Sequence, residues 1–175
     1  LFYREGYFEQ TLDTWGKQIE AYPENDLHAL PITPARNSKG EPVRITVPLP
    51  GVTLHATAWR MDVGRIPLFL LDTNLPENPP ELRAITGRLR QELLLGVGGL
   101  RALEAMGLEV AASHMNEGHA AFLGLERMAK SVRKGLSLRE SQAFVRRTSI
   151  FTTHTPVPAG NETFDLGLLK PHLDA

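Results

Sequence analysis

Hydrophobic and polar residues alternate along the first half of the chain in a pattern that predicts three β-strands. Residues 43–47 alternate apolar with polar side chains, residues 52–61 do so again, and residues 66–71 form a short apolar run. A period of two is typical of a strand with one buried face. Turns that contain glycine or proline join the segments, so residues 43–72 are predicted to form an antiparallel meander.

The second half of the chain changes to helical spacing. Residues 91–106 place apolar side chains three and four positions apart, which predicts a helix. The three glycines inside it each cost about 1 kcal/mol relative to alanine, so we expect another backbone to pack closely there. Residues 118–134 and 137–147 are also predicted helices, and Ser137 with Glu140 forms a capping box at the start of the second.

Two short strands are predicted on either side of the two later helices, at residues 108–112 and 149–153. A strand–helix–helix–strand order predicts a parallel α/β layer. We therefore predict an α/β fold in a single domain, which the family resemblance described below makes a partial one. Residues 1–80 form its β-rich portion, with the antiparallel meander, and residues 81–175 form its α/β portion.

Polar residues gather directly after the first of these strands, where His114, Asn116, Glu117 and His119 lie within six residues. Ligands bind beyond the carboxyl ends of strands in open α/β sheets, so this segment is a candidate site. Zinc is disfavoured, because zincin histidines lie four residues apart on one helix face and these lie five apart. The structural alternative places Glu117 in the first turn of a helix, where its charge suits the helix dipole, with the histidines as hydrogen-bonding residues.

A second candidate segment follows the other predicted strand. His154 lies at the strand end, Thr155 follows it, and two prolines stiffen the residues that lead to Glu162. Because proline fixes φ at about −65°, such a loop is rigid before a ligand arrives, which suits a site that holds sugar hydroxyl groups in a fixed pattern. A stiff connection with a buried histidine would explain the same residues, and the pattern leaves both interpretations open.

Composition narrows the classes of function. The 175 residues carry a formal net charge of −1, with 42% hydrophobic and 22% charged residues, as in an ordinary globular protein. This balance gives no indication of nucleic acid or an anionic membrane as a partner. No apolar run approaches the about 20 residues of a membrane span. The chain contains no cysteine, which excludes disulfides, thiolate catalysis and cysteine-ligated zinc.

The ends and the remaining motifs add three expectations. No signal-peptide pattern opens the chain, so we expect a cytoplasmic protein. The first residue is Leu1 rather than methionine, so we expect the sequence to be part of a longer protein. A Ser/His/Asp triad is disfavoured, because the chain has no Gly-x-Ser-x-Gly motif.

Five motifs, in the same order along the chain, resemble the glycogen, starch and maltodextrin phosphorylases, in particular their bacterial and archaeal branch. The two candidate segments carry two of them, HMNEGHAAF at residues 114–122 and FTTHTPVPAG at residues 151–160. The other three lie at residues 3–10, 71–75 and 90–99. Because the motifs are collinear and extend from end to end, the resemblance is specific.

The resemblance implies a fold and a reaction. The fold is the GT-B type, in which two Rossmann-like domains face each other across a cleft, with this chain as part of the N-terminal domain. Pyridoxal phosphate is implied as the cofactor, held as a Schiff base by a lysine outside this chain. Orthophosphate would cleave the terminal α-1,4 bond of a glucan and release glucose 1-phosphate. The full-length enzyme is expected to be a homo-oligomer, and the chain alone to be inactive.

The resemblance also implies roles for individual residues. His154 is the implied catalytic histidine, with its ring near the 6-hydroxyl group of glucose and its backbone carbonyl near the anomeric carbon. Glu162 would help to arrange the surroundings of the sugar. The implied substrate-binding residues are His154, Thr155, Asn116, Glu117, His119 and Glu162. No residue of the chain is expected to bind the cofactor or a metal.

The chain departs from the family pattern between Leu89 and Arg90, where relatives have an additional short segment with a Tyr-Gly-Gly-Asp-like sequence. We expect a break in the chain there, caused by a flexible loop that is missing from the sequence.

Two other classes of function remain open. A nucleotide-sugar-dependent glucan synthase of the GT-B type would share the fold but need no pyridoxal phosphate. A non-catalytic carbohydrate-binding module would present exposed aromatic side chains to a sugar. Aromatic residues make up only 7% of this chain, and none cluster at the two candidate segments.

Overall fold

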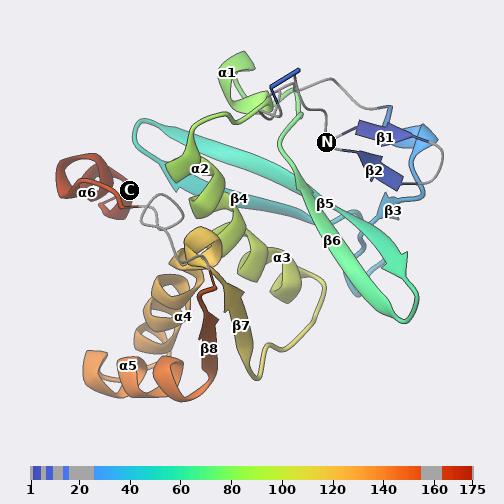
Figure 1. Ribbon diagram of the computed structural model, residues 1–175. Helices are drawn as coiled ribbons and strands as arrows, with labels where there is room; N and C mark the ends of the chain where they lie inside the picture. The colour runs from blue at the N-terminus through green and yellow to red at the C-terminus, as the bar shows by residue number, and fades with distance from the viewer. Residues whose placement is uncertain (1, 5–6, 10–13, 16–25, 155–162, 175) are drawn as a thin grey trace.

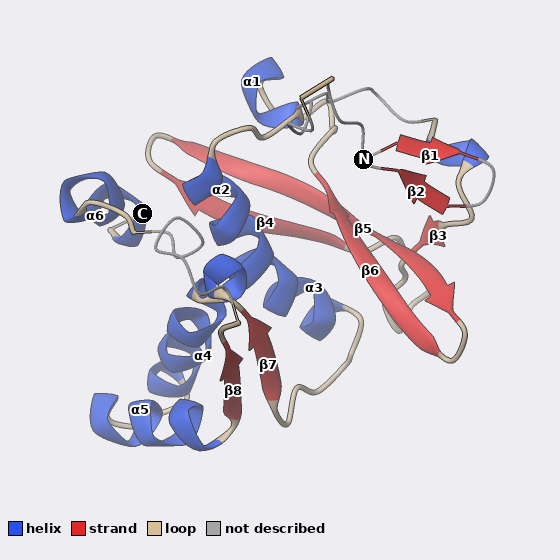
Figure 2. Cartoon of the chain, in the orientation of Figure 1, coloured by secondary structure: helices blue, strands red, loops and turns tan. Residues whose placement is uncertain are grey.

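The computed structural model describes residues 2–4, 7–9, 14–15, 26–154 and 163–174. In this part of the chain, a four-stranded antiparallel sheet packs against a long helical stretch, and two parallel strands lie beside the later helices (Figure 1, Figure 2). The predicted mixed α/β fold is thereby confirmed. Among the described helices, none has the length and apolar character needed to cross a membrane.

The antiparallel meander predicted at residues 43–72 is present. The sheet consists of β3 (Thr33–Pro34), β4 (Arg44–Leu49), β5 (Val52–Val63) and β6 (Ile66–Asp72). β4 and β3 pair with one edge of the long strand β5, and β6 pairs with its other edge. Gly51 and Gly64 make the two tight turns with φ of 73° and 62°, a conformation that glycine adopts without steric cost. A separate antiparallel pair is formed by β1 (Phe2–Arg4) and β2 (Tyr7–Glu9).

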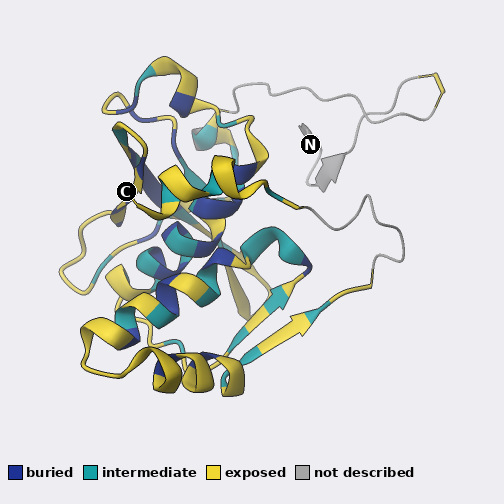
Figure 3. Ribbon diagram, turned by 90° about the vertical axis from the view of Figure 1, so that its left-hand side faces the viewer, coloured by how far each residue is buried: buried dark blue, intermediate teal, exposed yellow. Residues whose placement is uncertain are grey.

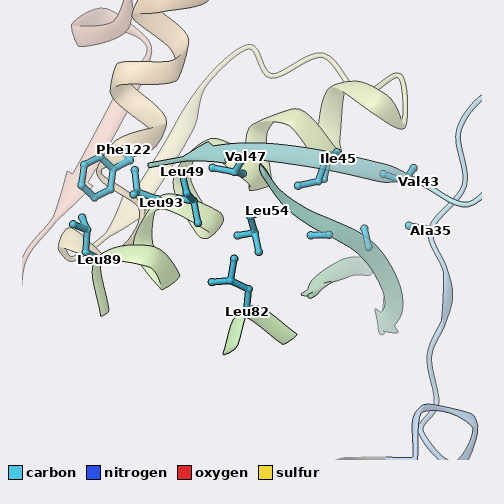
Figure 4. Close-up of a cluster of buried hydrophobic side chains, with 13 residues drawn as sticks. Ala35, Val43, Ile45, Val47, Leu49, Leu54, Leu82, Leu89, Leu93 and Phe122 are labelled. Carbon is cyan, nitrogen blue, oxygen red and sulfur yellow. The ribbon is translucent and has the colours of Figure 1, made fainter. Parts of the chain in front are cut away.

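The buried face of the sheet carries the hydrophobic core, which Figure 4 shows in close-up. Along β4, Ile45, Val47 and Leu49 are buried and alternate with exposed residues, as the sequence pattern predicts. Leu54 of β5 is fully buried beside them. The helices that cover this face contribute Leu82, Leu89, Leu93, Ala102 and Phe122. Because burial of each large aliphatic side chain contributes about 1.5–3 kcal/mol, this contact holds the sheet and the helices together.

The described α-helices are α1 (Pro80–Arg83), α2 (Arg88–Leu93), α3 (Gly99–Ala105), α4 (Phe122–Arg133), α5 (Leu138–Arg147) and α6 (Leu166–Leu173). The helix predicted at residues 91–106 consists of α2, a π-helical segment (Leu94–Gly98) and α3, which follow one another without interruption. The break expected between Leu89 and Arg90 is wrong. Both residues lie inside α2, and the N–H of Gln91 donates to the C=O of Gly87 at 3.0 Å.

Close packing against another backbone explains why residue 96 in this helical stretch is a glycine. A Cβ atom at Gly96 would lie 2.6 Å from the backbone nitrogen of Leu123 and 3.0 Å from the backbone carbonyl carbon of Phe122. The expectation that another backbone packs closely here is therefore confirmed, and that backbone is the start of α4. A Cβ atom at Gly99, in contrast, would meet nothing within 4 Å.

The strand predicted at residues 108–112 is wrong, because the strand begins later. β7 (Ser113–Asn116) pairs in parallel with β8 (Ser149–Thr152), and the pairing opens with a bond from the N–H of Ser113 to the C=O of Thr148 at 2.9 Å. Residues 108–112 have no partner strand in the described part of the chain. β7 therefore contains His114 and Asn116, which were expected to follow the strand.

Helices α4 and α5 connect the two parallel strands. The predicted capping box is present at the start of α5: the N–H of Ser137 donates to Glu140 Oε2 at 2.8 Å, and the N–H of Glu140 donates to Ser137 Oγ at 3.3 Å. The predicted strand–helix–helix–strand order and its parallel strand pair are thus confirmed.

A buried carboxylate ties α4 to α3 and to the sheet. Arg101 donates to both oxygens of Glu126, at 2.8 and 3.3 Å, and to the C=O of Thr46 in β4 at 2.7 Å. Lys130 and Arg133 lie 3.7 and 3.8 Å from the same carboxylate. Burial opposes the ionisation of Glu126, but the bond from Arg101 and the three positive charges outweigh it and hold the pKa of Glu126 below its usual value. The network fixes α4, which follows the first candidate segment.

Candidate functional site

The two candidate segments begin next to each other, because the strands that precede them, β7 and β8, are parallel neighbours. β7 and β8 pair from Ser113 with Ser149 to Asn116 with Thr152. The N–H of Glu117 donates to the C=O of Thr152 at 2.8 Å, so backbone pairing continues one residue beyond β7. Glu117 and His154 thus lie at the carboxyl ends of the two strands, whereas His114 and Asn116 lie within β7, and Figure 1 shows the two strands running in the same direction. None of the residues in either strand is buried (Figure 3).

Glu117 has a backbone conformation that usually belongs to glycine. Its φ is 58° and its ψ is −167°. No other non-glycine residue in the described part of the chain has a positive φ. Such a conformation costs about 1–3 kcal/mol and concentrates at functional sites. Glu117 lies just before the 3₁₀ turn Gly118–Ala120, so the alternative that placed it in the first turn of a helix is wrong.

The side chain of Glu117 joins the two segments. The backbone N–H of His154 donates to Glu117 Oε1 at 3.0 Å, and His154 Nδ1 lies 3.5 Å from the same oxygen. The Glu117 side chain is 5% exposed, whereas the imidazole of His154 is 62% exposed. A hydrogen bond to a charged group contributes about 1.5–3 kcal/mol, and burial keeps water from competing for it. The buried carboxylate therefore fixes the main chain of His154 while the imidazole remains accessible to a ligand.

His119 forms a second contact between an imidazole and a carboxylate. Its Nδ1 lies 3.5 Å from Oε1 of Glu92, which belongs to α2 and whose side chain is 5% exposed. Arg88, one turn earlier in α2, brings its Nε to 3.8 Å from the same oxygen. The His119 side chain is 41% exposed. The helical stretch that covers the sheet therefore also reaches the candidate site.

The other predicted site residues lie in different situations. His114 Nε2 is 2.7 Å from Thr152 Oγ1, so this imidazole links the two strands. Asn116 is the last residue of β7 and is exposed. Thr155 and Glu162 lie outside the described residues. The structure thus brings Glu117 together with His154. The roles of Thr155 and Glu162 stay predictions.

These groups are suited to binding hydroxyl groups. A neutral imidazole carries one donor and one acceptor, and an ionised carboxylate offers acceptors only, so together they match groups that both donate and accept. The main chain of His154 is already fixed by Glu117, which lowers the ordering cost of binding. Within the described residues, no three histidine, aspartate or glutamate side chains come together as metal donors.

The described lysines offer no shielded Schiff-base site for pyridoxal phosphate, since Lys39 and Lys134 are exposed. Lys130 pairs with Glu104 and Glu126, and Lys170 pairs with Asp174.

Arg127 of α4 holds the opposite ends of the two strands. Its Nη1 donates to Ser113 Oγ at 2.9 Å, to the C=O of Thr148 at 3.0 Å and to Ser149 Oγ at 3.2 Å, and its Nη2 donates to Thr148 Oγ1 at 2.9 Å. The guanidinium also lies 5.4 Å from the ring centre of Phe144. Burial lowers the pKa of Arg127, but a guanidinium remains protonated in proteins. The charge thus serves to align the strands at the end remote from Glu117.

Sequence reasoning missed Glu92 and Arg127. Glu92 lies between Leu89 and Leu93 on the apolar side of the predicted helix, where a carboxylate that becomes buried needs a partner. That position was a usable signal for Glu92. Arg127 gives no comparable signal, because its partners are hydroxyl and carbonyl groups of Ser113, Thr148 and Ser149, which many residues could supply.

Known proteins resemble the chain over almost its whole length. It is 43% identical over 182 residues to the maltodextrin phosphorylase of Thermococcus litoralis, covering 99% of the chain and 22% of that protein. It is 41% identical over 190 residues to the glycogen phosphorylase of Mycobacterium tuberculosis, again covering 99% and 22%. The glycogen phosphorylase of Aquifex aeolicus is 30% identical over 181 residues, covering 97% of the chain and 26% of that protein. No protein-family model and no solved structure matches the chain.

A parallel strand pair with polar groups at its carboxyl end, flanked by helices, defines an α/β protein with a candidate ligand site at the strand ends. The sequence similarity then shows that the chain is homologous to a segment of the glycogen and maltodextrin phosphorylases. The chain spans 22% of the length of the first two of these relatives. The alignment with the Thermococcus protein is longer than the 175 residues of the chain, so that relative has additional residues within this stretch.

Proposed function

We propose that this chain forms one wall of the glucan-binding cleft of an α-glucan phosphorylase. The observation that carries the proposal is the contact of Glu117 with His154, 3.0 Å from carboxylate oxygen to backbone nitrogen, at the carboxyl ends of two parallel strands. The strained backbone of Glu117 supports it, because such strain concentrates at functional sites. The homology to phosphorylases supplies the class of ligand, a glucan with its terminal glucose in the cleft.

The complete enzyme would transfer a glucosyl group to orthophosphate. Phosphate would cleave the terminal α-1,4 bond of glycogen, starch or maltodextrin and release glucose 1-phosphate with retained configuration. Pyridoxal phosphate, the cofactor implied by the family, would supply a phosphate group that relays a proton, and its lysine would lie outside these 175 residues. The architecture would be the GT-B type, with this chain in the N-terminal domain, and the complete enzyme would form homo-oligomers.

Within this function, His154 would act on the terminal glucose. Its exposed imidazole is available to a sugar hydroxyl group, and its backbone carbonyl would face the anomeric carbon, where a carbonyl dipole stabilises an oxocarbenium-like transition state. Glu117 would contribute by holding the peptide group that precedes this carbonyl. His119 and Asn116 would border the pocket, and Thr155 and Glu162 would complete it.

Phosphorolysis by the complete gene product tests the proposal. Purified protein with maltodextrin, orthophosphate and added pyridoxal phosphate should release glucose 1-phosphate, and omission of phosphate or of the cofactor should abolish the release. Transfer from a nucleotide sugar in the absence of pyridoxal phosphate would instead support a glucan synthase. Binding of maltodextrin without either reaction would support a non-catalytic carbohydrate-binding module.

His154→Ala separates a catalytic role from a structural one. If His154 contacts the sugar mainly in the transition state, the variant should lose turnover with little change in unfolding free energy, because the imidazole is 62% exposed and the Glu117 bond uses the backbone. Unchanged turnover together with a large loss of stability would contradict the proposed role. His114→Ala is a matched control, because His114 contacts Thr152 within the strand pair.

A further inference from the structure

Glu92 is a buried carboxylate whose side chain reaches the candidate site from another part of the fold. It lies on α2, between the core residues Leu89 and Leu93, and only 5% of its side chain is exposed. A carboxylate in such a position is costly unless N–H groups compensate it. His119 Nδ1 at 3.5 Å and Arg88 Nε at 3.8 Å are the groups that approach its Oε1.

The chemistry of this contact restricts the imidazole. A carboxylate oxygen only accepts hydrogen bonds, so His119 must carry a proton on Nδ1 to bond with Glu92. In a neutral imidazole the other nitrogen, Nε2, then has no proton and can only accept. The His119 side chain is 41% exposed, so part of the ring remains accessible to a ligand while Nδ1 is occupied.

We propose that Glu92 is a positioning residue that holds His119 in the tautomer protonated at Nδ1, so that Nε2 accepts a hydrogen bond from a sugar hydroxyl group. The inference that this hydroxyl belongs to a glucan rests on the function proposed above. The choice of tautomer does not, because it follows from the contact between the two side chains. A fixed acceptor discriminates in favour of ligands that present a donor at that position, since an unpaired acceptor costs binding energy.

The tautomer can be measured directly on the 175-residue chain. In alkaline buffer, where imidazoles are neutral, the nitrogen chemical shifts of the ring distinguish protonated from unprotonated nitrogen, and His119→Gln identifies the signals of His119. The wild type should show Nδ1 protonated and Nε2 unprotonated. In Glu92→Gln the amide can either donate or accept, so the preference should relax toward protonation at Nε2. A wild-type ring protonated at Nε2, or an unchanged ring in Glu92→Gln, would overturn the proposal.

Glu126→Gln is a matched control, because Glu126 is also a buried helical glutamate but pairs with Arg101 and lies outside the candidate site. It should destabilise the chain and leave the His119 tautomer unchanged. In the complete gene product, Glu92→Gln should lower kcat/KM for maltodextrin by about two- to tenfold, the equivalent of one net hydrogen bond. Glu126→Gln should leave kcat/KM near the wild-type value. Equal losses in both variants would make Glu92 a structural residue only.

A double-mutant cycle tests whether Glu92 acts through His119. If it does, Glu92→Gln should have almost no further effect on kcat/KM in a His119→Ala background. Fully additive losses would overturn the inference. Absence of phosphorolysis in the wild-type gene product would reject the proposed function instead, and the tautomer measurement would then decide the role of Glu92 by itself.

Discussion

Replacement of Glu117 by glycine and by alanine should reverse the usual order of stability. Both substitutions remove the carboxylate and its bond to the N–H of His154, so that loss is common to the two variants. They differ in the backbone. Alanine must keep a φ near 58° and a ψ near −167°, whereas glycine adopts these angles without steric conflict.

The magnitude follows from two opposing terms. Relief of the strained conformation favours the glycine variant by about 1–3 kcal/mol. The greater conformational freedom of glycine in the unfolded chain favours alanine by about 0.4–1 kcal/mol. With central values of about 2 and 0.7 kcal/mol for the two terms, Glu117→Gly should be more stable than Glu117→Ala by about 1.3 kcal/mol. With a denaturant slope of about 2 kcal/mol per molar urea, the unfolding midpoint should differ by about 0.6 M.

Urea unfolding followed by circular dichroism measures this difference. Ala143 supplies the control, because it is exposed on the regular helix α5, where Ala143→Gly should destabilise by about 1 kcal/mol. The reasoning predicts opposite signs at the two positions. An alanine variant at Glu117 that is as stable as the glycine variant, or more stable, would refute the strained backbone and remove one support for a functional site at this position.

The remaining predictions concern packing and charge. Gly96→Ala should lower the unfolding free energy by about 1–3 kcal/mol, because its Cβ would lie 2.6 Å from a backbone nitrogen. Gly99→Ala should raise the unfolding free energy by about 1 kcal/mol, because its Cβ would meet nothing within 4 Å. Urea unfolding of the two variants tests both predictions. Ser141→Ala should raise the unfolding free energy by about 1 kcal/mol and the melting temperature by about 2–4 °C, because the hydroxyl is buried without a partner among the described residues. The lowered pKa of Glu126 stabilises the fold above its usual value of 4.5, and this contribution is lost as the pH falls through the lowered value. Glu126→Gln should therefore show a shallower loss of stability in acid, measured by urea unfolding at several pH values.

The period of two predicted β4 well, because one face of that strand is buried and the other is exposed. The burial of alternate residues in β4 is the direct physical counterpart of the alternation that the sequence shows over residues 43–47. The same reasoning failed at residues 108–112. That segment has an apolar run, but a strand also needs a partner, and backbone pairing begins only at Ser113, opposite Ser149. Hydrophobicity alone cannot specify where pairing begins.

The candidate site was predictable in part. Polar residues after two predicted strands identified both segments as candidates, and the parallel pairing of β7 with β8 brings Glu117 and His154 together. The positive φ of Glu117 was not predictable, because glutamate has no local preference for that conformation. Glu92 required knowledge of how α2 packs, since it lies 27 residues from His119 in the sequence.

Different polar contacts hold the two ends of the parallel strand pair. Neither β7 nor β8 has a buried residue, so these contacts, rather than core packing, position the site. At one end, Arg127 donates to groups on or next to both strands. At the other end, Glu117 receives the N–H of His154 and donates its own N–H to Thr152. A slip of one residue along β8 would break both sets of contacts at once. Polar contacts at the ends of the strands therefore specify their register. The strained backbone of Glu117 is the local free-energy cost of its contacts with Thr152 and His154.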